Sequence, residues 1–449
     1  MAAGPTLDGL AADLAAGRTS ARALTEACLA RIDDPAGQGA VVFIQVDREG
    51  ALAAADAMDG LRAAGAQPSR FAGIPISIKD LFDVQGQATR AGSVVLDGPP
   101  AAQDAPAVAR LRQAGFVLIG RTNMTEFAFS GLGYNPHYGT PLGPWGREEG
   151  RIAGGSTSGG AASVADAMAH AALGTDTGGS CRIPAAFCGL VGYKPTASRT
   201  PRSGAVPLST TLDSVGPIAR SVGCCASIDA LLARSQAPAL DGAAASDLRL
   251  LAPQNVVLEG MDSVVADTLE DALSRLSAAG ARISRIPFPE FDRIAALNAR
   301  GGFAAPEAYA WHRRLIEAAA DRYDPRVLTR IRRGAEQSAA DFVDLIADRT
   351  ALVADARRRL TGFDALVMPT APMVAPRLSD LEDDAEFGRI NLLALRNSTA
   401  INVIDGCAIS VPAHRPGAAP VGLMLAAAGG QDERLFQIAA AVERVLAGG

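Results

Sequence analysis

Apolar positions recur along the chain with two different periods, and each change of period predicts a new element. Over residues 1–64 the apolar side chains follow helical spacing, which predicts N-terminal packing helices. Isoleucines then alternate with other residues along 74–78, as in a strand that is half-buried and turns Lys79 away from the isoleucine face. A helix at 105–114 and a short apolar strand at 116–120 follow. Strand, helix and strand in succession are typical of a βαβ unit.

The second half of the chain repeats this alternation. A strand is predicted at 248–253, a helix at 262–279 and a further strand after Gly280. The whole pattern predicts an α/β fold, a single large domain over residues 1–449 with a central mixed, mostly parallel β-sheet covered by helices on both faces. Two segments stand apart: residues 236–246 (QAPALDGAAAS) predict a low-complexity connection, and residues 298–360 predict a helical region that we expect to cover a substrate pocket.

The segment Arg151–Pro184 (RIAGGSTSGGAASVADAMAHAALGTDTGGSCRIP) concentrates the candidate chemistry. It places Ser156 and Ser180 in two glycine-rich loops, which we predict to be joined by one alanine-rich helix that contains His170. Glycine is the residue for crowded backbone and for close approach to a ligand, so the two loops indicate a pocket. Residues 131–150 are rich in glycine and proline and are a candidate functional loop over it.

Several function classes are disfavoured by composition and by motifs. The formal net charge of −6 argues against a nucleic-acid partner, and no apolar run is long enough for a membrane span. The six cysteines and four histidines show no metal-binding spacing, so we expect neither a metal nor a cofactor. The glycine loops contain no Walker motif, no GxGxxG and no GxSxG hydrolase elbow.

A serine nucleophile activated by something other than histidine remains, and lysine is the usual substitute. Lys79 is the candidate base, because burial near the sheet would favour its neutral amine. A serine between base and nucleophile could receive one proton while passing on another.

Long motifs, in order, then indicate a family. The segments GGSTSG (154–159) and LGTDTGGSCRIPAAFCGLVGYKPT (173–196) resemble the amidase signature family of hydrolases. The upstream GIPISIKD (73–80) looks like that family's lysine segment, and the resemblance continues through TRAGS (89–93) and GRTNMTEFAFS (120–130) to the C-terminal MPTAP and SVPAHRPGAAPVGLMLAA. It covers almost the whole chain and implies the amidase signature fold.

The resemblance implies a Ser-cisSer-Lys triad. Ser180 would be the acyl-forming nucleophile, Ser156 the bridging serine and Lys79 the proton acceptor, and the serines are 24 positions apart, as in the family's signature. The family's Gly–Ser peptide before the bridging serine is cis, here Gly155–Ser156. The other predicted site residues fall into three groups: an oxyanion hole from the N–H groups of Thr177, Gly178, Gly179 and Ser180; structural support from Gly155, Ser158, Asp176 and Arg182; and a substrate pocket lined by Phe127, Ala128, Ser130, Gly131, Tyr134, Tyr309 and Trp311.

Two residues depart from the family pattern. Thr157 stands where the family has glycine or serine, and Cys181 follows the nucleophile where the family has an aliphatic residue. Neither change removes a catalytic group, and cysteine packs as a small hydrophobe. Cys181 as the nucleophile remains an alternative.

The predicted function is hydrolysis of a small carboxamide through a serine acyl-enzyme, without a cofactor. The motifs do not separate enzymes similar to indoleacetamide hydrolases, malonamidases, carboxybiuret hydrolases or fatty acid amide hydrolases. The main alternative is the glutaminase component of a tRNA-dependent amidotransferase, where we expect an acidic residue to hold the glutamine amino group; residues 390–404 (INLLALRNSTAINVI) contain no acid. A catalytically inactive binding protein is a third reading. We expect a cytoplasmic protein, with a homodimer left open.

Overall fold

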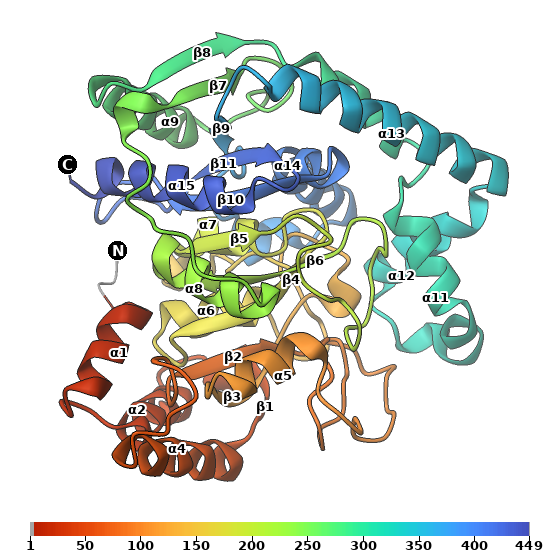
Figure 1. The fold of residues 1–449 in the computed structure, drawn as a ribbon. Helices are drawn as coiled ribbons and strands as arrows, with labels where there is room; N and C mark the ends of the chain where they lie inside the picture. Colours follow the sequence, from red (N-terminus) through yellow and green to blue (C-terminus); the bar gives the residue numbers. More distant parts are fainter. Residues whose placement is uncertain (1–3, 449) are drawn as a thin grey trace.

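An eleven-stranded sheet runs through the protein, and the computed structural model describes it within residues 4–448. Its strand order is β1-β3-β2-β4-β6-β5-β10-β11-β9-β7-β8, and in Figure 1 it extends from β1, β3 and β2 at the bottom to β7 and β8 at the top. The strands are β1 (Phe43–Val46), β2 (Pro75–Lys79), β3 (Val117–Thr122), β4 (Ala171–Asp176), β5 (Val191–Lys194), β6 (Ser214–Ala219), β7 (Arg249–Pro253), β8 (Arg282–Ile286), β9 (Ala365–Pro369), β10 (Gly406–Pro412) and β11 (Gly422–Ala428).

The predicted α/β class and mixed sheet are confirmed, but parallel pairing is confined to two parts of the sheet. Strands β3, β2 and β4 are parallel neighbours, as are β8, β7 and β9. In the sheet described within residues 4–448, the other six of the ten neighbouring pairs are antiparallel. The expectation of a mostly parallel sheet is therefore wrong. The βαβ units were visible in the sequence, whereas β6 and the β10–β11 pairing that build the antiparallel middle were not.

Helices cover both faces of this sheet. Alternate residues of β4 show the two layers: Leu173 packs in one core cluster with Ile78 and with Cys225 of α8, while Ala172 packs in another with Ala161 of α6. Both faces of β4 are therefore buried, whereas the edge strand β8 keeps exposed residues. The helices are α1 (Leu7–Ala15), α2 (Ala21–Asp33), α3 (Gly39–Val42), α4 (Arg48–Ala63), α5 (Pro106–Gln113), α6 (Ser158–Ala165), α7 (Arg182–Cys188), α8 (Val222–Ala233), α9 (Ser263–Ala278), α10 (Ile294–Asn298), α11 (Ala304–Ala319), α12 (Pro325–Arg332), α13 (Ala339–Leu360), α14 (Asp384–Val403) and α15 (Asp432–Ala447).

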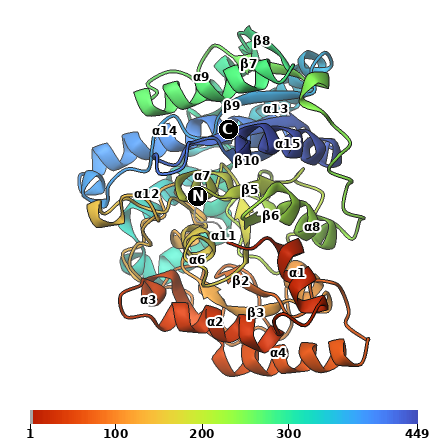
Figure 2. The same cartoon turned by 90° about the vertical axis from the view of Figure 1, so that its left-hand side faces the viewer.

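The segments singled out in the sequence have recognisable places. Within residues 1–64, of which 1–3 lie outside the described residues, the predicted helices are α1, α2 and α4, and the edge strand β1 was not foreseen. Figure 2 shows these helices gathered at the lower end of the molecule. Residues 236–246 connect α8 to β7, with a short 3₁₀ turn beginning at their end. Residues 298–360 are helical and contain α11, α12 and α13; whether they cover a substrate pocket stays a prediction.

The segment between the glycine loops differs from its prediction. The single helix expected there is the short helix α6 followed by strand β4, which begins at Ala171. His170 is therefore not within a helix; it is buried at the start of β4, where burial and the nearby Arg220 lower its pKa to about 4. Alanine favours helices in isolation, but here the register with β2 and β6 makes a central strand out of an alanine-rich sequence.

Candidate active site

Lys79 is the last residue of β2, and the parallel pairing with β4 determines what it faces. Ile78 lies opposite Leu173, so one step further along the strand brings Lys79 level with Gly174, beside Thr175. Its Nζ donates to Ser156 Oγ at 2.7 Å and to Thr175 Oγ1 at 2.9 Å. The contact with Ser156 places two of the predicted triad residues in direct hydrogen-bond contact.

Lys79 is fully buried, and burial lowers the pKa of its amine to about 8, although Cys181, Asp176 and Asp213 act in the opposite direction. The strand is more enclosed than the half-buried strand predicted from the sequence. Ile76 and Ile78 face the opposite side of β2, where they join the α8 core, and the strand is buried on both faces. The amine is instead enclosed by the α6 side of the sheet and by the glycine loops.

The first glycine loop, residues 154–160, holds the bridging serine. The Gly155–Ser156 peptide is cis, as the resemblance predicts, and Ser156 is fully buried. Gly155 donates its N–H to the Gly131 carbonyl at 2.8 Å, and a Cβ at Gly155 would lie 2.4 Å from the Gly133 nitrogen. Ser158 begins α6, and its hydroxyl contacts the Asn123 carbonyl at 3.5 Å. Close approach between two backbones therefore requires glycine at position 155.

The second glycine loop, residues 177–181, holds the predicted nucleophile. Ser180 is 3% exposed, and the Thr157 N–H donates to its carbonyl at 3.3 Å, which brings the two loops together. Gly179 has a φ of +133°, and a Cβ there would lie 2.1 Å from Ser398 Oγ. The Gly179 N–H donates to Asp176 Oδ1 at 2.9 Å. The prediction that Gly179 contributes to the oxyanion hole is therefore corrected, because its N–H group is already bonded to the Asp176 side chain.

Asp176 and Arg182 form a buried ion pair beneath the second loop. Arg182 donates through two nitrogens to the Asp176 carboxylate, at 2.8 and 3.0 Å, and both side chains are fully buried. The carboxylate also accepts from the Cys181 N–H at 3.1 Å. Burial alone would raise the pKa of Asp176, but the charge and hydrogen bonds of Arg182 hold it well below its usual range. These are the contacts of residues that hold a loop in place, and helix α7 follows directly, beginning at Arg182.

Both departures from the family pattern pack against glycine. A Cβ at Gly174 would lie 2.8 Å from Thr157 Cγ2 and 3.1 Å from Cys181 Sγ, and one at Gly160 would lie 2.7 Å from the same methyl. The absence of side chains at these two glycines provides the space for the threonine methyl. Cys181 is fully buried, and burial raises the pKa of its thiol to about 12, so it is not a thiolate at neutral pH.

Sequence reasoning missed a group of residues around Thr175. Thr175 contacts Lys79, and Thr177 donates its hydroxyl to Asp213 Oδ1 at 2.5 Å. Burial raises the pKa of Asp213 to about 6. A cavity of about 300 Å³ adjoins this group, lined by Thr175, Arg202, Ser203, Ala205, Val206, Pro207, Thr210, Asp213 and Val215. Only the pairing of β4 with β6 brings position 213 to the site, so no local motif could have found it.

The predicted pocket residues do not line this cavity. Phe127 and Trp311 meet, with ring centroids 6.1 Å apart. Tyr134 packs edge-on against Phe387 of α14, and Tyr309 packs partly buried against the main core. Ala128 ends the 3₁₀ turn Glu126–Ala128, and Ser130 and Gly131 follow this turn.

Helix α14 lies against residues 130–131 and against the second glycine loop. Asn391 Oδ1 accepts from the Ser130 hydroxyl at 2.8 Å and from the Gly131 N–H at 2.9 Å. One turn later, Leu395 would be 3.0 Å from a Cβ at Gly131. A further turn on, Thr399 donates to the Gly178 carbonyl at 3.1 Å. This helix was not predicted, because buried asparagines and a buried serine interrupt its apolar spacing.

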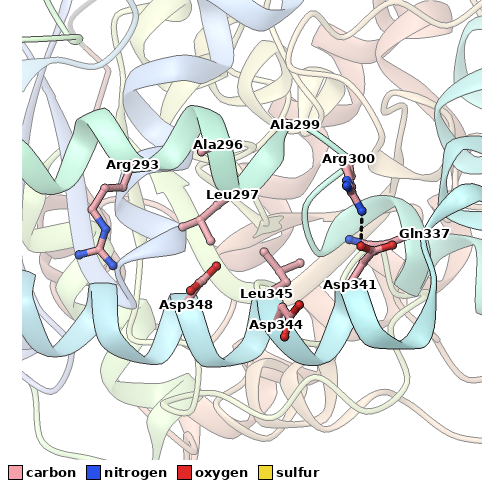
Figure 3. Close-up of a pocket in the computed structure, with 10 residues that line it drawn as sticks. All are labelled: Arg293, Ala296, Leu297, Ala299, Arg300, Gln337, Asp341, Asp344, Leu345 and Asp348. Atoms are coloured by element: carbon pink, nitrogen blue, oxygen red, sulfur yellow. Dashed lines mark hydrogen bonds and ion pairs between the residues drawn. The ribbon is translucent and has the colours of Figure 1, made fainter.

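A second cavity, of about 450 Å³, lies between α10 and α13 (Figure 3). Aspartates line it, but Arg300 bonds Asp341, and Arg293 bonds Asp355 of the same helix. None of the predicted site residues lines it, and we assign it no function. Within residues 4–448 no cluster of acidic, histidine or cysteine side chains has the arrangement of a metal site. No helix in the same range is long and apolar enough to span a membrane.

Comparison with known proteins gives one consistent answer. The amidase family pattern matches residues 23–436. The 2-amino-5-chloromuconic acid deaminase of Comamonas testosteroni is 37% identical over 407 residues, which cover 89% of this chain and 87% of that protein. The A subunit of the glutamyl-tRNA(Gln) amidotransferase of Acidothermus cellulolyticus is 33% identical, with 97% of this chain and 93% of that protein covered. A crystal structure of an amidase superposes with a TM-score of 0.89 at 30% identity, covering 98% of this chain and 99% of that one.

Proposed function

This chain belongs to the amidase family and is an amide-hydrolysing enzyme, and we propose that it cleaves a small carboxamide through an acyl-enzyme on Ser180. The observation that carries the proposal is the 2.7 Å contact between the buried Lys79 amine and the Ser156 hydroxyl. A lysine buried beside a serine, with its pKa lowered to about 8, is a base that can work near neutral pH.

The proton path follows from this contact. As Ser180 Oγ attacks the carbonyl carbon, its proton passes to Ser156 Oγ, and the Ser156 proton passes to the neutral amine of Lys79. Lys79 then returns a proton through Ser156 to the departing nitrogen, and the carbon–nitrogen bond breaks. Water repeats the sequence on the acyl-enzyme, which releases the carboxylic acid and regenerates Ser180. The base thus acts on the nucleophile without touching it.

The oxyanion hole is proposed for the N–H groups of Thr177, Gly178 and Ser180. Among the hydrogen bonds formed within residues 4–448, none uses the N–H of Gly178 or Ser180 as a donor, whereas Gly179 donates to Asp176. Donors that are already oriented cost little reorganisation when negative charge develops on the substrate oxygen. Asp176 supports this arrangement, because it fixes the loop on the side away from the ligand.

The glutaminase alternative is weaker. Helix α14 presents Asn391 and Leu395 to Gly131 and Thr399 to the second glycine loop, and all three are uncharged. At these three positions a glutamine amino group would find no carboxylate, and an unpaired charge is costly in a buried site. The deaminase relative, whose name specifies a small organic acid, is also more similar to this chain than the amidotransferase relative is. We therefore propose small carboxamides of organic acids as the substrate class.

The test is to assay the purified chain, without a second protein, for ammonia release from aliphatic, aryl and indolic amides, from glutamine and from aminomuconic acids. We expect turnover of one small amide or amino acid class, with glutamine a poor substrate, and labelling of Ser180 by a fluorophosphonate. The Cys181→Ala protein is the matched control and should label normally. Labelling that persists in Ser180→Ala would contradict the mechanism, and efficient glutamine turnover would favour the alternative.

A cytoplasmic location, a homodimer and the absence of a nucleic-acid partner remain predictions. Fractionation of the host cell and sedimentation of the purified protein with and without nucleic acid would test them.

A further inference from the structure

Glu126 is a buried carboxylate that the proposed reaction does not use. It is 0% exposed and lies directly after Thr125, in the motif GRTNMTEFAFS, which the catalytic assignment leaves unexplained. One carboxylate oxygen accepts from the Ser93 hydroxyl at 2.7 Å and contacts His137 Nε2 at 2.9 Å. The other accepts from the Asp324 N–H at 2.7 Å. Three segments far apart in sequence therefore meet at one carboxylate.

The Asp324 contact joins Glu126 to the start of helix α12. Asp324 is the N-cap residue of α12, and its own side chain accepts from the Arg326 N–H. Glu126 thus bonds the peptide at which this helix begins. The helix dipole stabilises a negative charge at this end of the helix. A hydrogen bond from an N–H group to a carboxylate is also stronger than one to a neutral acceptor.

The residues that follow Glu126 contact helix α12 and also helix α11 beside it. The Phe127 ring packs edge-on against His312 of α11 at 4.3 Å between centroids and lies 5.4 Å from Tyr323. Arg330 of α12 donates to the Phe129 carbonyl at 2.9 Å. In Figure 1, α11 and α12 lie together at the right-hand edge of the molecule. Residues 126–129 therefore fasten the α11–α12 pair by hydrogen bonds at one helix and ring contacts at the other.

The two ends of the 125–131 segment bind the first glycine loop instead, one at Ser156 and the other at Gly155. The Thr125 N–H donates to the Ser156 carbonyl at 3.1 Å, and the Gly131 carbonyl accepts from the Gly155 N–H at 2.8 Å. Between them, Phe127 and Ala128 have positive φ values of 49° and 61°, which residues with side chains rarely adopt. Such conformations persist where surrounding contacts determine them. The 125–131 segment is thus held from both sides, by the α11–α12 pair and by the cis peptide loop.

We propose that Glu126 is a positioning residue for amide hydrolysis, fastening the α11–α12 pair to the segment that holds Ser156. The inference rests on the proposed function, since Ser156 must be the proton relay for its position to matter. Loss of the carboxylate would loosen the helix pair and displace Ser156 at the same time. Both the KM and kcat should then change, because the helix pair and the relay respond to one group.

The test compares Glu126→Gln with Glu290→Gln. Glu290 is also a buried carboxylate in a short 3₁₀ segment, where Arg359 binds it, and it contacts no residue of the site. We expect both variants to lose thermal stability. Only Glu126→Gln should lower kcat/KM, by about 10- to 100-fold, with a raised KM and a reduced kcat. A loss of kcat/KM no larger than in Glu290→Gln would overturn the proposal.

A second measurement does not depend on the catalytic assignment. In a Trp145→Phe background the fluorescence of Trp311 reports on the contact between α11 and Phe127, because these are the two tryptophans of the chain. Glu126→Gln should shift this emission and speed hydrogen exchange over residues 323–332, while β10 and β11 stay protected. If these changes occur without a kinetic effect, the helix contact stands and the positioning role is wrong; if neither occurs, both are wrong.

Should Glu126→Gln fail to fold, Ser93→Ala provides a milder version. It removes one of the three donors and leaves the carboxylate in place. We expect a 2- to 5-fold fall in kcat/KM, on the order of one neutral hydrogen bond, and faster exchange over the same residues. Unchanged kinetics with unchanged exchange in this variant would also count against the proposal.

Discussion

The two glycine loops have similar sequences but are held by different kinds of contact. In the first loop, a Cβ at Gly155 would meet the backbone of Gly133, and one at Gly159 would lie 2.4 Å from the Val42 carbonyl. In the second loop, a Cβ at Gly178 would lie 2.9 Å from Thr399 Oγ1, and one at Gly179 would meet Ser398 Oγ. Backbone cannot move aside as a side chain can. The first loop is therefore fixed by the core, and the second by helix α14 and Asp176.

This difference suits the roles we propose for the two serines. Ser156 must keep one position relative to Lys79 throughout the reaction, and a loop packed backbone against backbone supplies that. Ser180 must carry an acyl group while negative charge develops on the neighbouring substrate oxygen. Its loop therefore needs N–H donors that point at the substrate. The carboxylate of Asp176 holds the second loop in place by accepting the N–H groups of Gly179 and Cys181.

The largest expected effect separates the two serines. Ser180→Ala should reduce kcat by on the order of 10⁴-fold or more and abolish fluorophosphonate labelling, because the bond-forming atom is lost. Ser156→Ala should reduce kcat by about 10² to 10⁴-fold, since only the proton path is lost. Slow labelling of Ser180 should persist in Ser156→Ala, as mass spectrometry of the labelled peptide would show. Equal labelling rates in Ser156→Ala and the wild type would exclude Ser156 as the relay.

Alanine in place of a glycine should be more harmful where it meets backbone, as in the first loop, than where it meets a side chain, as in the second. Gly155→Ala places a methyl against the Gly133 backbone and should cost about 10² to 10³-fold in kcat/KM, because the relay serine is displaced. Gly178→Ala meets the Thr399 hydroxyl, which can rotate away, and should cost less. The double variant Gly178→Ala/Thr399→Ala should recover activity relative to Gly178→Ala alone. If Gly178→Ala is the more damaging of the two single variants, the proposed difference between the loops is wrong.

Asp176→Asn tests what holds the second loop. The change leaves the Arg182 charge buried without its partner and should destabilise the fold by about 3–5 kcal/mol. Asp166→Asn is the matched control, since its partner Arg147 is 37% exposed, and should cost about 1 kcal/mol or less. Urea unfolding followed by circular dichroism gives both values. Similar losses in the two variants would show that the Asp176 pair is not a special support of the loop.

The sequence names the candidate triad more directly than it predicts the sheet, for physical reasons. Lys79, Ser156 and Ser180 lie in contiguous motifs whose residue types are tied to their chemistry, so they could be named without coordinates. Thr175 and Asp213 reach the site through the pairing of β2, β4 and β6, and long-range pairing leaves no local signal. Strand β4 was missed because its alanines favour a helix until neighbouring strands enclose them. Strand β6, which makes two of the antiparallel pairs, was missed because a proline and a glycine interrupt its apolar pattern.

The smallest expected effect concerns Thr175, which contacts Lys79 from the side of the second loop. Because Lys79 acts as a base when neutral, kcat/KM should rise with pH through about 8 and level off above it. Thr175→Val removes an acceptor that stabilises the ammonium form, so the rise should move to lower pH by less than about one unit. The plateau should fall about 5- to 10-fold, as expected for one hydrogen bond that orients the base. Thr175→Ser keeps the hydroxyl and should match the wild type. A Thr175→Val profile that falls uniformly, with no shift along the pH axis, would mean that Thr175 supports the second loop without acting on the lysine. The pKa of Lys79 would then not depend on its contact with the second loop.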